Sequence, residues 1–507
     1  MTSSRLVRTA TGAGERLDTI AHVVVRALGS TWFFVLVVVG FATQAFAIAL
    51  SAHRIIVDEG YHLGIIRLYA QQWSPFLANT EASQNFGDVE RYGSYVYHYL
   101  MSFPMRLVLP LGLDEDTVMV LMRVVTVLLF LSSFPAFRAL LRALGATPAV
   151  TNVSLLLFAA LPLSSFTAAT VNYDNLIIPL FAVVALLGVR LVTTPHPTLA
   201  AVLGFLTVGM VASLTKYTFL PVFAGAVIVL LVVLAVRRER TRSILAGVRA
   251  EVRTVRFWLI AAAFVGLIAL FVERYLRNLL DYGTPAPDCA KIESEAYCYH
   301  YGPWRRNSTL DEEFPDQPKT IGNGLFYYVQ TWVPALLRTV TLSGTITDNG
   351  PRGSNGLPIT ASILMVALAV ATFVLLVTAS KITRVPGAAM VAVPFVITVL
   401  ALFWLNYSDY RAFGQVLGVS SRYLLHFAPL VIAATVAGLS LILRRVHVRP
   451  AVWQVGFVLL GLALITQGGG ALNFFVSADD SWFLSNSPLG DLPSLFNRIA
   501  RRILVLG

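Results

Sequence analysis

The sequence predicts an all-α protein, a polytopic bundle of transmembrane helices with interfacial helices in its first outer loop. Of its 507 residues, 56% are hydrophobic and only 13% are charged, whereas about a quarter of the residues of a soluble globular domain are charged. The apolar residues also gather into about eleven runs, each long enough to cross the hydrocarbon core of a bilayer as a helix. Spans and short loops therefore account for most of the chain.

Charged or Pro- and Gly-containing breaks separate the apolar runs. The runs cover residues 32–50, 117–137, 149–168, 176–192, 199–214, 219–236, 257–272, 359–378, 388–405, 423–443 and 452–472. The first run is too long for the apolar core of a secretory signal. Residues 1–30, which carry four arginines, are therefore expected to be a cytoplasmic tail.

Basic residues set the predicted orientation. Residues 237–256 hold seven arginines and two glutamates, and loops rich in Lys and Arg stay on the cytoplasmic side. This loop places the N-terminus inside and the tail, residues 474–507, outside, although that tail has a basic amphipathic end at Arg498, Arg501 and Arg502. The net charge of +11 is thus a matter of topology, and no nucleic-acid partner is expected.

Two transmembrane modules and one long outer loop follow from this orientation. Residues 31–275 form the N-terminal module, which includes the first outer loop at 51–117, and residues 358–473 form the C-terminal helices. Between them, residues 276–357 hold nine acids, seven bases and both cysteines. Cys289 and Cys298 are expected to form a disulfide if this loop faces an oxidising compartment, and two free thiols are the alternative.

The first outer loop opens with two adjacent acids, Asp58 and Glu59. Burying a carboxylate at the mouth of a span is costly unless it is hydrated or used. We predict that one or both are catalytic, since a carboxylate at a partly apolar site can act as a base. The alternative is that they only stabilise the start of a helix near Gly60.

Further polar and aromatic side chains lie in the same loop. His62 would share a helix face with Asp58, and it is a candidate for sugar binding or proton transfer, as are Tyr97 and His98 in a Tyr-rich patch; membrane-interface packing is the alternative for all three. Asp88 and Glu90 have an acid-x-acid spacing that could hold a divalent cation such as Mg²⁺ or Mn²⁺, or simply form a solvated surface.

The order of these features resembles the GT-C class of integral membrane glycosyltransferases, which use lipid-phosphate-linked sugars. The resemblance extends to the short motifs Asn172-Tyr173-Asp174-Asn175, Lys216-Tyr217 and Ser421-Arg422-Tyr423. It implies a catalytic carboxylate in the first outer loop, by position Asp58 with Glu59 beside it. It also implies a polyprenyl-phosphate-sugar donor and a glycan or lipid acceptor at the extracytoplasmic surface.

A phosphate-bearing donor makes cations at the outer ends of spans candidate ligands. Lys216, Arg411 and Arg422 are such cations, although each alone also fits an anchor that extends to the interface. Asp174, in a predicted outer turn, is either structural or a substrate contact, and Tyr423 follows Arg422 in its motif.

We therefore expect a hexosyl- or pentosyltransferase of a bacterial cell membrane that acts on cell-envelope or cell-wall glycans. Asp58 would take the acceptor proton, Glu59 or a metal would assist, and Lys216 or Arg422 would neutralise the leaving phosphate. A lipid or glycan transporter or flippase is the main alternative. It predicts ionisable groups deep inside spans, where Arg123 is the clearest case. A non-catalytic membrane scaffold is a third possibility.

Overall fold

The computed structural model describes residues 19, 21–53, 58–313, 324–341, 359–413, 417–466, 472, 475 and 482–504. Val57, most of the predicted N-terminal tail, and Asp479 and Asp480 of the predicted outer tail lie outside them. The described residues are almost all helical, and their one isolated antiparallel bridge joins Ala52 to Phe483. The predicted all-α class is therefore confirmed.

Three groups of helices follow one another along the chain. The first group is α2 (Thr31–Ser51), α3 (Glu59–Ala70), α4 (Glu81–Gln84), α5 (Val89–Tyr92), α6 (Val96–Val108), η1 (Leu109–Leu111), α7 (Glu115–Leu131), α8 (Ser133–Ala143), α9 (Pro148–Ala160) and α10 (Pro162–Ala168). The second is α11 (Asp174–Thr193), α12 (Leu199–Thr215), η2 (Tyr217–Phe219), α13 (Leu220–Val236), α14 (Arg238–Glu251), α15 (Val255–Phe271), η3 (Val272–Leu276) and α16 (Arg277–Tyr282). The third is α17 (Cys289–Ile292), α18 (Glu295–Cys298), α19 (Gly302–Glu313), α20 (Gly324–Thr341), α21 (Ile359–Ile382), α22 (Ala389–Phe413), η4 (Ser421–Phe427), α23 (Ala428–Arg445), α24 (Pro450–Thr466) and α26 (Leu492–Leu504).

Eight helical segments of the described part are long and apolar enough to cross a membrane. They are α2, α7 with α8, α11, η2 with α13, α15 with α16, α21, α22, and η4 with α23. The pair α9 and α10, bent by 72°, is a ninth candidate. The predicted count of eleven would also need α12 and α24, each 17 residues long, to cross. That count stays a prediction, while the multi-pass membrane fold is clear.

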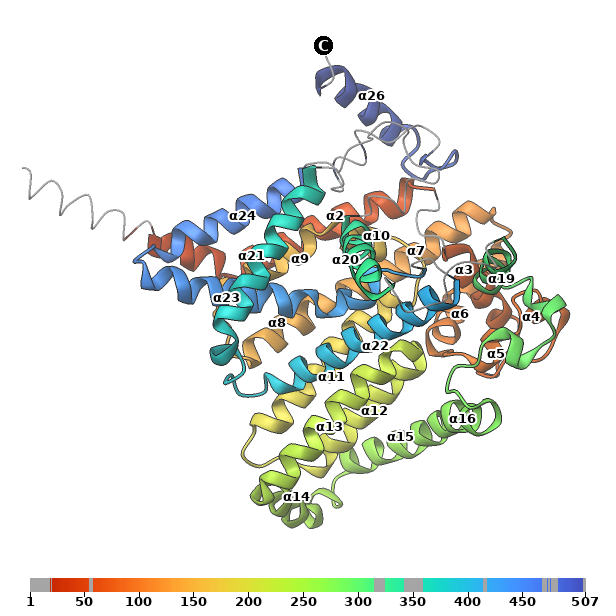
Figure 1. The fold of residues 1–507 in the computed structure, drawn as a ribbon, viewed down its shortest axis with the longest axis horizontal. Helices are drawn as coiled ribbons and strands as arrows, with labels where there is room; N and C mark the ends of the chain where they lie inside the picture. Colours follow the sequence, from red (N-terminus) through yellow and green to blue (C-terminus); the bar gives the residue numbers. More distant parts are fainter. Residues whose placement is uncertain are drawn as a thin grey trace, which may run out of the picture.

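The bundle has two distinct ends (Figure 1). The short helices α3 to α6, from the first predicted outer loop, and α16 and α19 gather at the right of the view, where α2 also ends. The arginine-rich helix α14 lies at the lower left. Helix α11 packs against α7, α8, α12 and α13, so it connects the first helices of the bundle to the later ones. The loop-rich end and the arginine-rich end therefore lie apart, and the orientation in the membrane stays a prediction.

The two predicted outer loops pack on each other. Cys289 and Cys298 form a disulfide, and their segment lies against Gly87, which has a φ of +69°. A Cβ at Gly87 would lie 2.8 Å from Cβ of Tyr301 and 3.0 Å from Sγ of Cys289. Only glycine fits both this left-handed conformation and this close approach. The disulfide segment thus lies against the first outer loop, where interfacial helices were predicted and where α3 and α6 are the longest helices.

Candidate functional site

Four side chains form an alternating chain of opposite charges at the loop-rich end, which we call the charged cluster: Asp58, Arg422, Asp174 and Lys216. Nη2 of Arg422 donates to Oδ2 of Asp58 at 2.7 Å. Nε of the same arginine lies 3.2 Å from Oδ2 of Asp174, and Nζ of Lys216 donates to Oδ1 of Asp174 at 2.6 Å. The cluster therefore unites four predicted site residues that lie up to 364 positions apart in the sequence.

Only one member of the charged cluster is substantially exposed. The side chain of Asp58 is 43% exposed, whereas Asp174, Lys216 and Arg422 are 2%, 3% and 8% exposed. Two buried cations against one buried carboxylate leave a positive excess behind Asp58. The cluster thus presents an accessible carboxylate in front of a cationic interior.

Each cluster residue stands where a helix begins or ends. Asp58 directly precedes α3, Asp174 is the first residue of α11, Lys216 caps the C-terminus of α12, and Arg422 is the second residue of η4. Side chains at such breaks can converge from several helices without displacing the apolar faces that pack the bundle. The fold thereby collects polar groups at one end.

The turn before α11 is built by its own asparagines. Oδ1 of Asn172 accepts the backbone N–H of Asp174 at 2.9 Å, and Nδ2 of Asn175 donates to the carbonyl of Thr170 at 2.7 Å. An Asn side chain that bonds the backbone two residues on forms a compact turn. We expected a turn over 172–175 with the helix after it, and the helix instead begins at Asp174. This start aims the carboxylate of Asp174 at Lys216.

Aromatic rings enclose the lysine of the cluster. Nζ of Lys216 lies 4.3 Å from the ring centroid of Tyr173 and 4.5 Å from that of Tyr423, within the range of cation–π attraction. Burial lowers the pKa of Lys216, which lies in the break between α12 and η2, to about 8, although Asp174 opposes the shift. Lys216 is therefore mostly charged at neutral pH and loses its charge in mildly alkaline solution. Tyr423 thus contacts Lys216, and its predicted contact with a substrate stays a prediction.

Glu59 forms a second, separate ion pair with Arg123 of α7. Its Oε1 accepts from Nε of Arg123 at 2.8 Å and from the backbone N–H of Val171 at 2.9 Å, and its Oε2 accepts from Nη2 of Arg123 at 2.6 Å. Glu59 is 0% and Arg123 1% exposed. The arginine also donates to the carbonyls of Ala52 and His53 at the end of α2. One buried pair thus joins α2, α3, α7 and the segment before α11.

This pairing favours an anchoring role for Glu59 over the catalytic role expected for it. Both of its oxygens accept hydrogen bonds, and a buried carboxylate held in this way has no access to a substrate. Its backbone neighbour, Asp58, is bonded instead to Arg422. Arg123 is the partner that sequence reasoning missed, and the available signal was its position as a lone charge in an apolar run, where a buried partner should be sought.

His62, His98 and Tyr97 lie behind the cluster. Nδ1 of His62 and Nε2 of His98 are 2.8 Å apart, and Nδ2 of Asn172 lies 3.3 Å from Nε2 of His62. Burial lowers the pKa of both histidines, that of His98 to about 3, so the pair is neutral. Because Oδ1 of Asn172 already accepts the N–H of Asp174, its amide group donates to His62, and His62 in turn donates to His98. These buried rings position Asn172, and Tyr97, fully buried, packs edge-on against them.

Three further candidates lie outside the cluster. Arg411 is exposed in the last turn of α22 and takes part in none of the cluster's ion pairs. Oδ2 of Asp88 accepts from Arg91 at 2.9 Å, and burial raises the pKa of Glu90 to about 8, which leaves Glu90 mostly uncharged at neutral pH. Cation binding by these two acids stays a prediction. In the described part of the chain, no group of three or more His, Cys, Asp or Glu side chains could hold a metal ion.

Comparison with known proteins adds two similar structures. No protein-family model matches the sequence, and no curated protein matches it. The two structures are of ArnT from Cupriavidus metallidurans, one in the apo state, with 15% identity and a TM-score of 0.32 over 80% of this chain and 76% of that chain. The other, bound to undecaprenyl phosphate, has 14% identity and a TM-score of 0.34 over 80% of this chain and 78% of that chain.

Identities and TM-scores this low do not by themselves make this chain a member of a family.

Proposed function

We propose that this protein is a membrane glycosyltransferase that moves a sugar from a polyprenyl-phosphate donor to a hydroxyl of an extracytoplasmic glycan or lipid. The observation that carries the proposal is the charged cluster, in which an accessible carboxylate stands directly in front of two buried cations. Glycosyl transfer to a hydroxyl from a lipid phosphate needs both groups at one point: a base for the acceptor and positive charge for the leaving phosphate.

Asp58 is the proposed base. Its carboxylate is the exposed end of the cluster, and one oxygen accepts from Arg422. A positioned carboxylate that removes the proton from an attacking hydroxyl typically accelerates transfer by about 10²–10⁴-fold. The neighbouring Glu59 is already held by Arg123, which leaves Asp58 as the acid of the pair that can reach an acceptor.

Arg422 and Lys216 are the proposed phosphate ligands. Nε of Arg422 lies 3.2 Å from Oδ2 of Asp174 and is buried without a hydrogen-bond partner. Arginine binds phosphate through parallel hydrogen bonds, whereas lysine contributes a compact charge. Asp174 holds the two cations together before the donor arrives and prevents their mutual repulsion from spreading them apart.

The environment of Arg123 supports an enzyme over a transporter. A translocation path needs ionisable groups that a passing substrate can contact. Arg123, the charge deepest in the predicted spans, is 1% exposed and bonded to Glu59 and to backbone carbonyls. It is fully occupied as a structural link.

Cell-envelope synthesis is the proposed setting. By the predicted orientation the charged cluster faces the extracytoplasmic side, since the arginine-rich α14 lies towards the other end. On that side of the membrane, a lipid-phosphate-linked sugar can serve as the activated donor in place of a soluble nucleotide sugar.

The test is transfer of labelled sugar from polyprenyl-phosphate donors to membrane or cell-wall acceptors, with Asp58→Asn compared with wild type at matched expression. We expect a loss of about 100-fold or more. Asp281→Asn is the matched control, because this acid is also exposed, at 52%, and its partner Arg277 lies outside the cluster. Full activity of a folded Asp58→Asn variant would remove Asp58 from the mechanism. Absence of transfer by the wild type from every donor tried would favour the transporter.

A further inference from the structure

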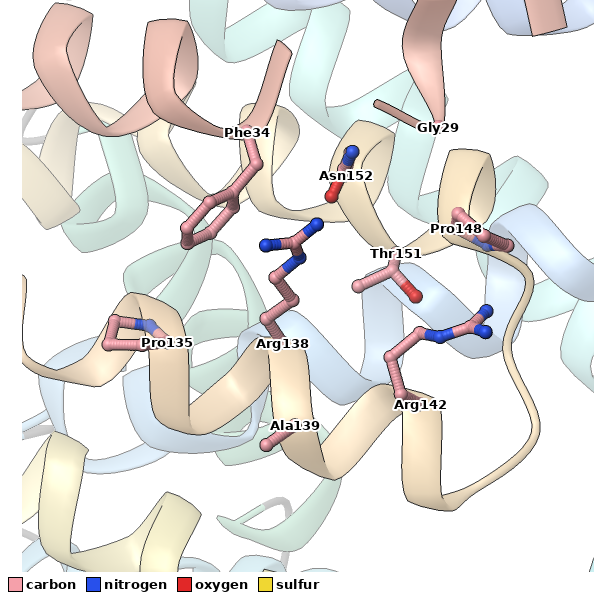
Figure 2. A pocket seen from close by; sticks show the side chains of 9 residues that line it. All are labelled: Gly29, Phe34, Pro135, Arg138, Ala139, Arg142, Pro148, Thr151 and Asn152. Atoms are coloured by element: carbon pink, nitrogen blue, oxygen red, sulfur yellow. The ribbon is translucent and has the colours of Figure 1, made fainter. Parts of the chain in front are cut away.

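A cavity of about 480 Å³ lies at the other end of α2 from Asp58, between the start of α2, helix α8 and the start of α9 (Figure 2). Phe34, Pro135, Ala139 and Pro148 form apolar parts of its wall. By the predicted orientation this end faces the cytoplasm. The cavity is therefore separate from the charged cluster by the length of a span.

Two arginines of α8 line the cavity one helical turn apart. The guanidinium of Arg138 lies over the ring of Phe34, 4.4 Å from its centroid, and its Nη2 donates to Oγ1 of Thr31 at 3.3 Å. Arg142 is exposed and donates to the carbonyl of Ala146. No ion pair with an acid is found for either arginine in the described part of the chain. Both guanidinium groups therefore keep N–H donors for an anion.

Two polar atoms in the wall are buried without a hydrogen-bond partner. Thr151 and Asn152 are 0% and 1% exposed, yet Oγ1 of Thr151 and Oδ1 of Asn152 have no partner. The amide nitrogen of Asn152 donates to the carbonyls of Leu28 and Ser30, each at 2.9 Å. These two bonds fix the orientation of the amide group, so its oxygen points away from both carbonyls. Figure 2 shows Asn152 beside the guanidinium of Arg138 and Thr151 between the two arginines.

An unpartnered buried polar atom costs about 1–3 kcal/mol. Arginines that serve only to set topology need no unpartnered polar atoms beside them. The unpartnered oxygens of Thr151 and Asn152 therefore point to a ligand.

We propose that this cavity binds a phosphate-bearing anion, in which a phosphate group accepts hydrogen bonds from Arg138, Arg142 and the hydroxyl of Thr151. Oδ1 of Asn152 accepts from a hydroxyl of the same ligand. Basic pockets between transmembrane helices on the cytoplasmic side are suited to anionic headgroups, and the apolar wall beside them suits an acyl chain. The source of the phosphate is either a lipid headgroup, such as that of phosphatidylglycerol, or free phosphate.

The test uses the full-length protein in neutral detergent and measures bound lipid by native mass spectrometry after addition of phosphatidylglycerol or phosphatidylcholine. We expect the wild type to retain phosphatidylglycerol preferentially, and the double variant R138Q/R142Q to retain about 100-fold less, since each of the two arginine–phosphate contacts contributes roughly a factor of ten or more. Thr151→Val removes only the hydroxyl and should reduce retention by about threefold.

The double variant R238Q/R242Q is the matched control. Arg238 and Arg242 have the same spacing, are exposed on the arginine-rich helix α14 and line a hollow whose hydroxyl, Thr241, is already bonded to the carbonyl of Leu234. This control should retain lipid as the wild type does. Equal loss in both double variants, or none in R138Q/R142Q, would overturn the proposal. If R138Q/R142Q does not fold, unchanged retention by Thr151→Val overturns it instead.

A second arm separates the two sources. Inorganic phosphate added without lipid should raise the melting temperature of the wild type but not of R138Q/R142Q if free phosphate is the ligand. A rise with phosphatidylglycerol alone assigns the site to a headgroup. No rise with either anion contradicts the proposal.

Discussion

The buried pair of Glu59 and Arg123 allows a structural role to be separated from a catalytic one. Glu59→Gln keeps the shape of the side chain but removes its charge, and it turns one oxygen into an amide group that faces the guanidinium. Two charged hydrogen bonds, at 2.8 and 2.6 Å, are lost or weakened, each worth about 1.5–3 kcal/mol. Arg123, 1% exposed, is left as an uncompensated charge. We expect the free energy of unfolding to fall by about 3–5 kcal/mol.

The assay is a double-mutant cycle with Glu59→Gln, Arg123→Met and the combined variant, unfolded in detergent and followed by circular dichroism. The combined variant should lose much less than the sum of the single losses, because neither charge is then left alone. Transfer activity per folded molecule should stay within about threefold of the wild type in the combined variant. A large loss of activity in a Glu59→Gln protein of wild-type stability would refute the anchoring role and restore Glu59 as a catalytic group.

Three further predictions concern the cluster and the loops that cover it. Lys216 has a pKa of about 8 and is charged below that value, so the KM for the donor should rise as the pH increases through about 8. The KM of the Lys216→Arg variant should stay constant over the same pH range. A pH-independent KM in the wild type would exclude Lys216 as a phosphate ligand. The double variant Cys289→Ser/Cys298→Ser opens the loop that the disulfide closes over a separation of 9 residues. It should lower the free energy of unfolding by about 2–3 kcal/mol, which is measured as faster proteolysis of the segment around these cysteines in the absence of reductant. An unchanged rate of proteolysis would contradict this prediction. Gly87→Ala strains a left-handed position and places a Cβ 2.8 Å from Tyr301, so it should lower the melting temperature, whereas Gly112→Ala, at a φ of +63° with open space around it, should lower it less.

The apolar runs predicted the helices well because a bilayer imposes one requirement on every span: about 20 residues without charge. All eleven runs coincide with helical segments over the residues that the structure describes, the last of them from 452 to 466. The runs did not predict how many helices cross the membrane. Helices α12 and α24 are only a few residues shorter than a full span, and the 72° bend between α9 and α10 depends on packing. The beginning of α11 at Asp174 was missed for a local reason, the side-chain bond from Asn172.

The site was predictable by position but not by partnership. Asp58 and Glu59 are adjacent and chemically alike, yet residues on opposite sides of a helix start point to different neighbours, Arg422 and Arg123. Sequence spacing could not show this, because the partners lie 364 and 64 residues away. Arg411 and Arg422 pose the same difficulty. Both were expected at outer span ends, and only Arg422 stands at a break that faces the loop of Asp58.

The charge balance of the cluster explains why its two cations are buried together. Asp58, Asp174, Arg422 and Lys216 sum to zero charge, so the cations are compensated by the acids of the cluster itself. In the proposed reaction Asp58 gains a proton from the acceptor while the leaving phosphate gains a negative charge.

One unit of negative charge therefore moves from the exposed front of the cluster to its cationic interior. The buried environment amplifies the attraction of Arg422 and Lys216 for that charge where it develops. The same groups would stabilise a phosphodiester donor less than the product phosphate, and this difference between ground state and transition state is what lowers a barrier.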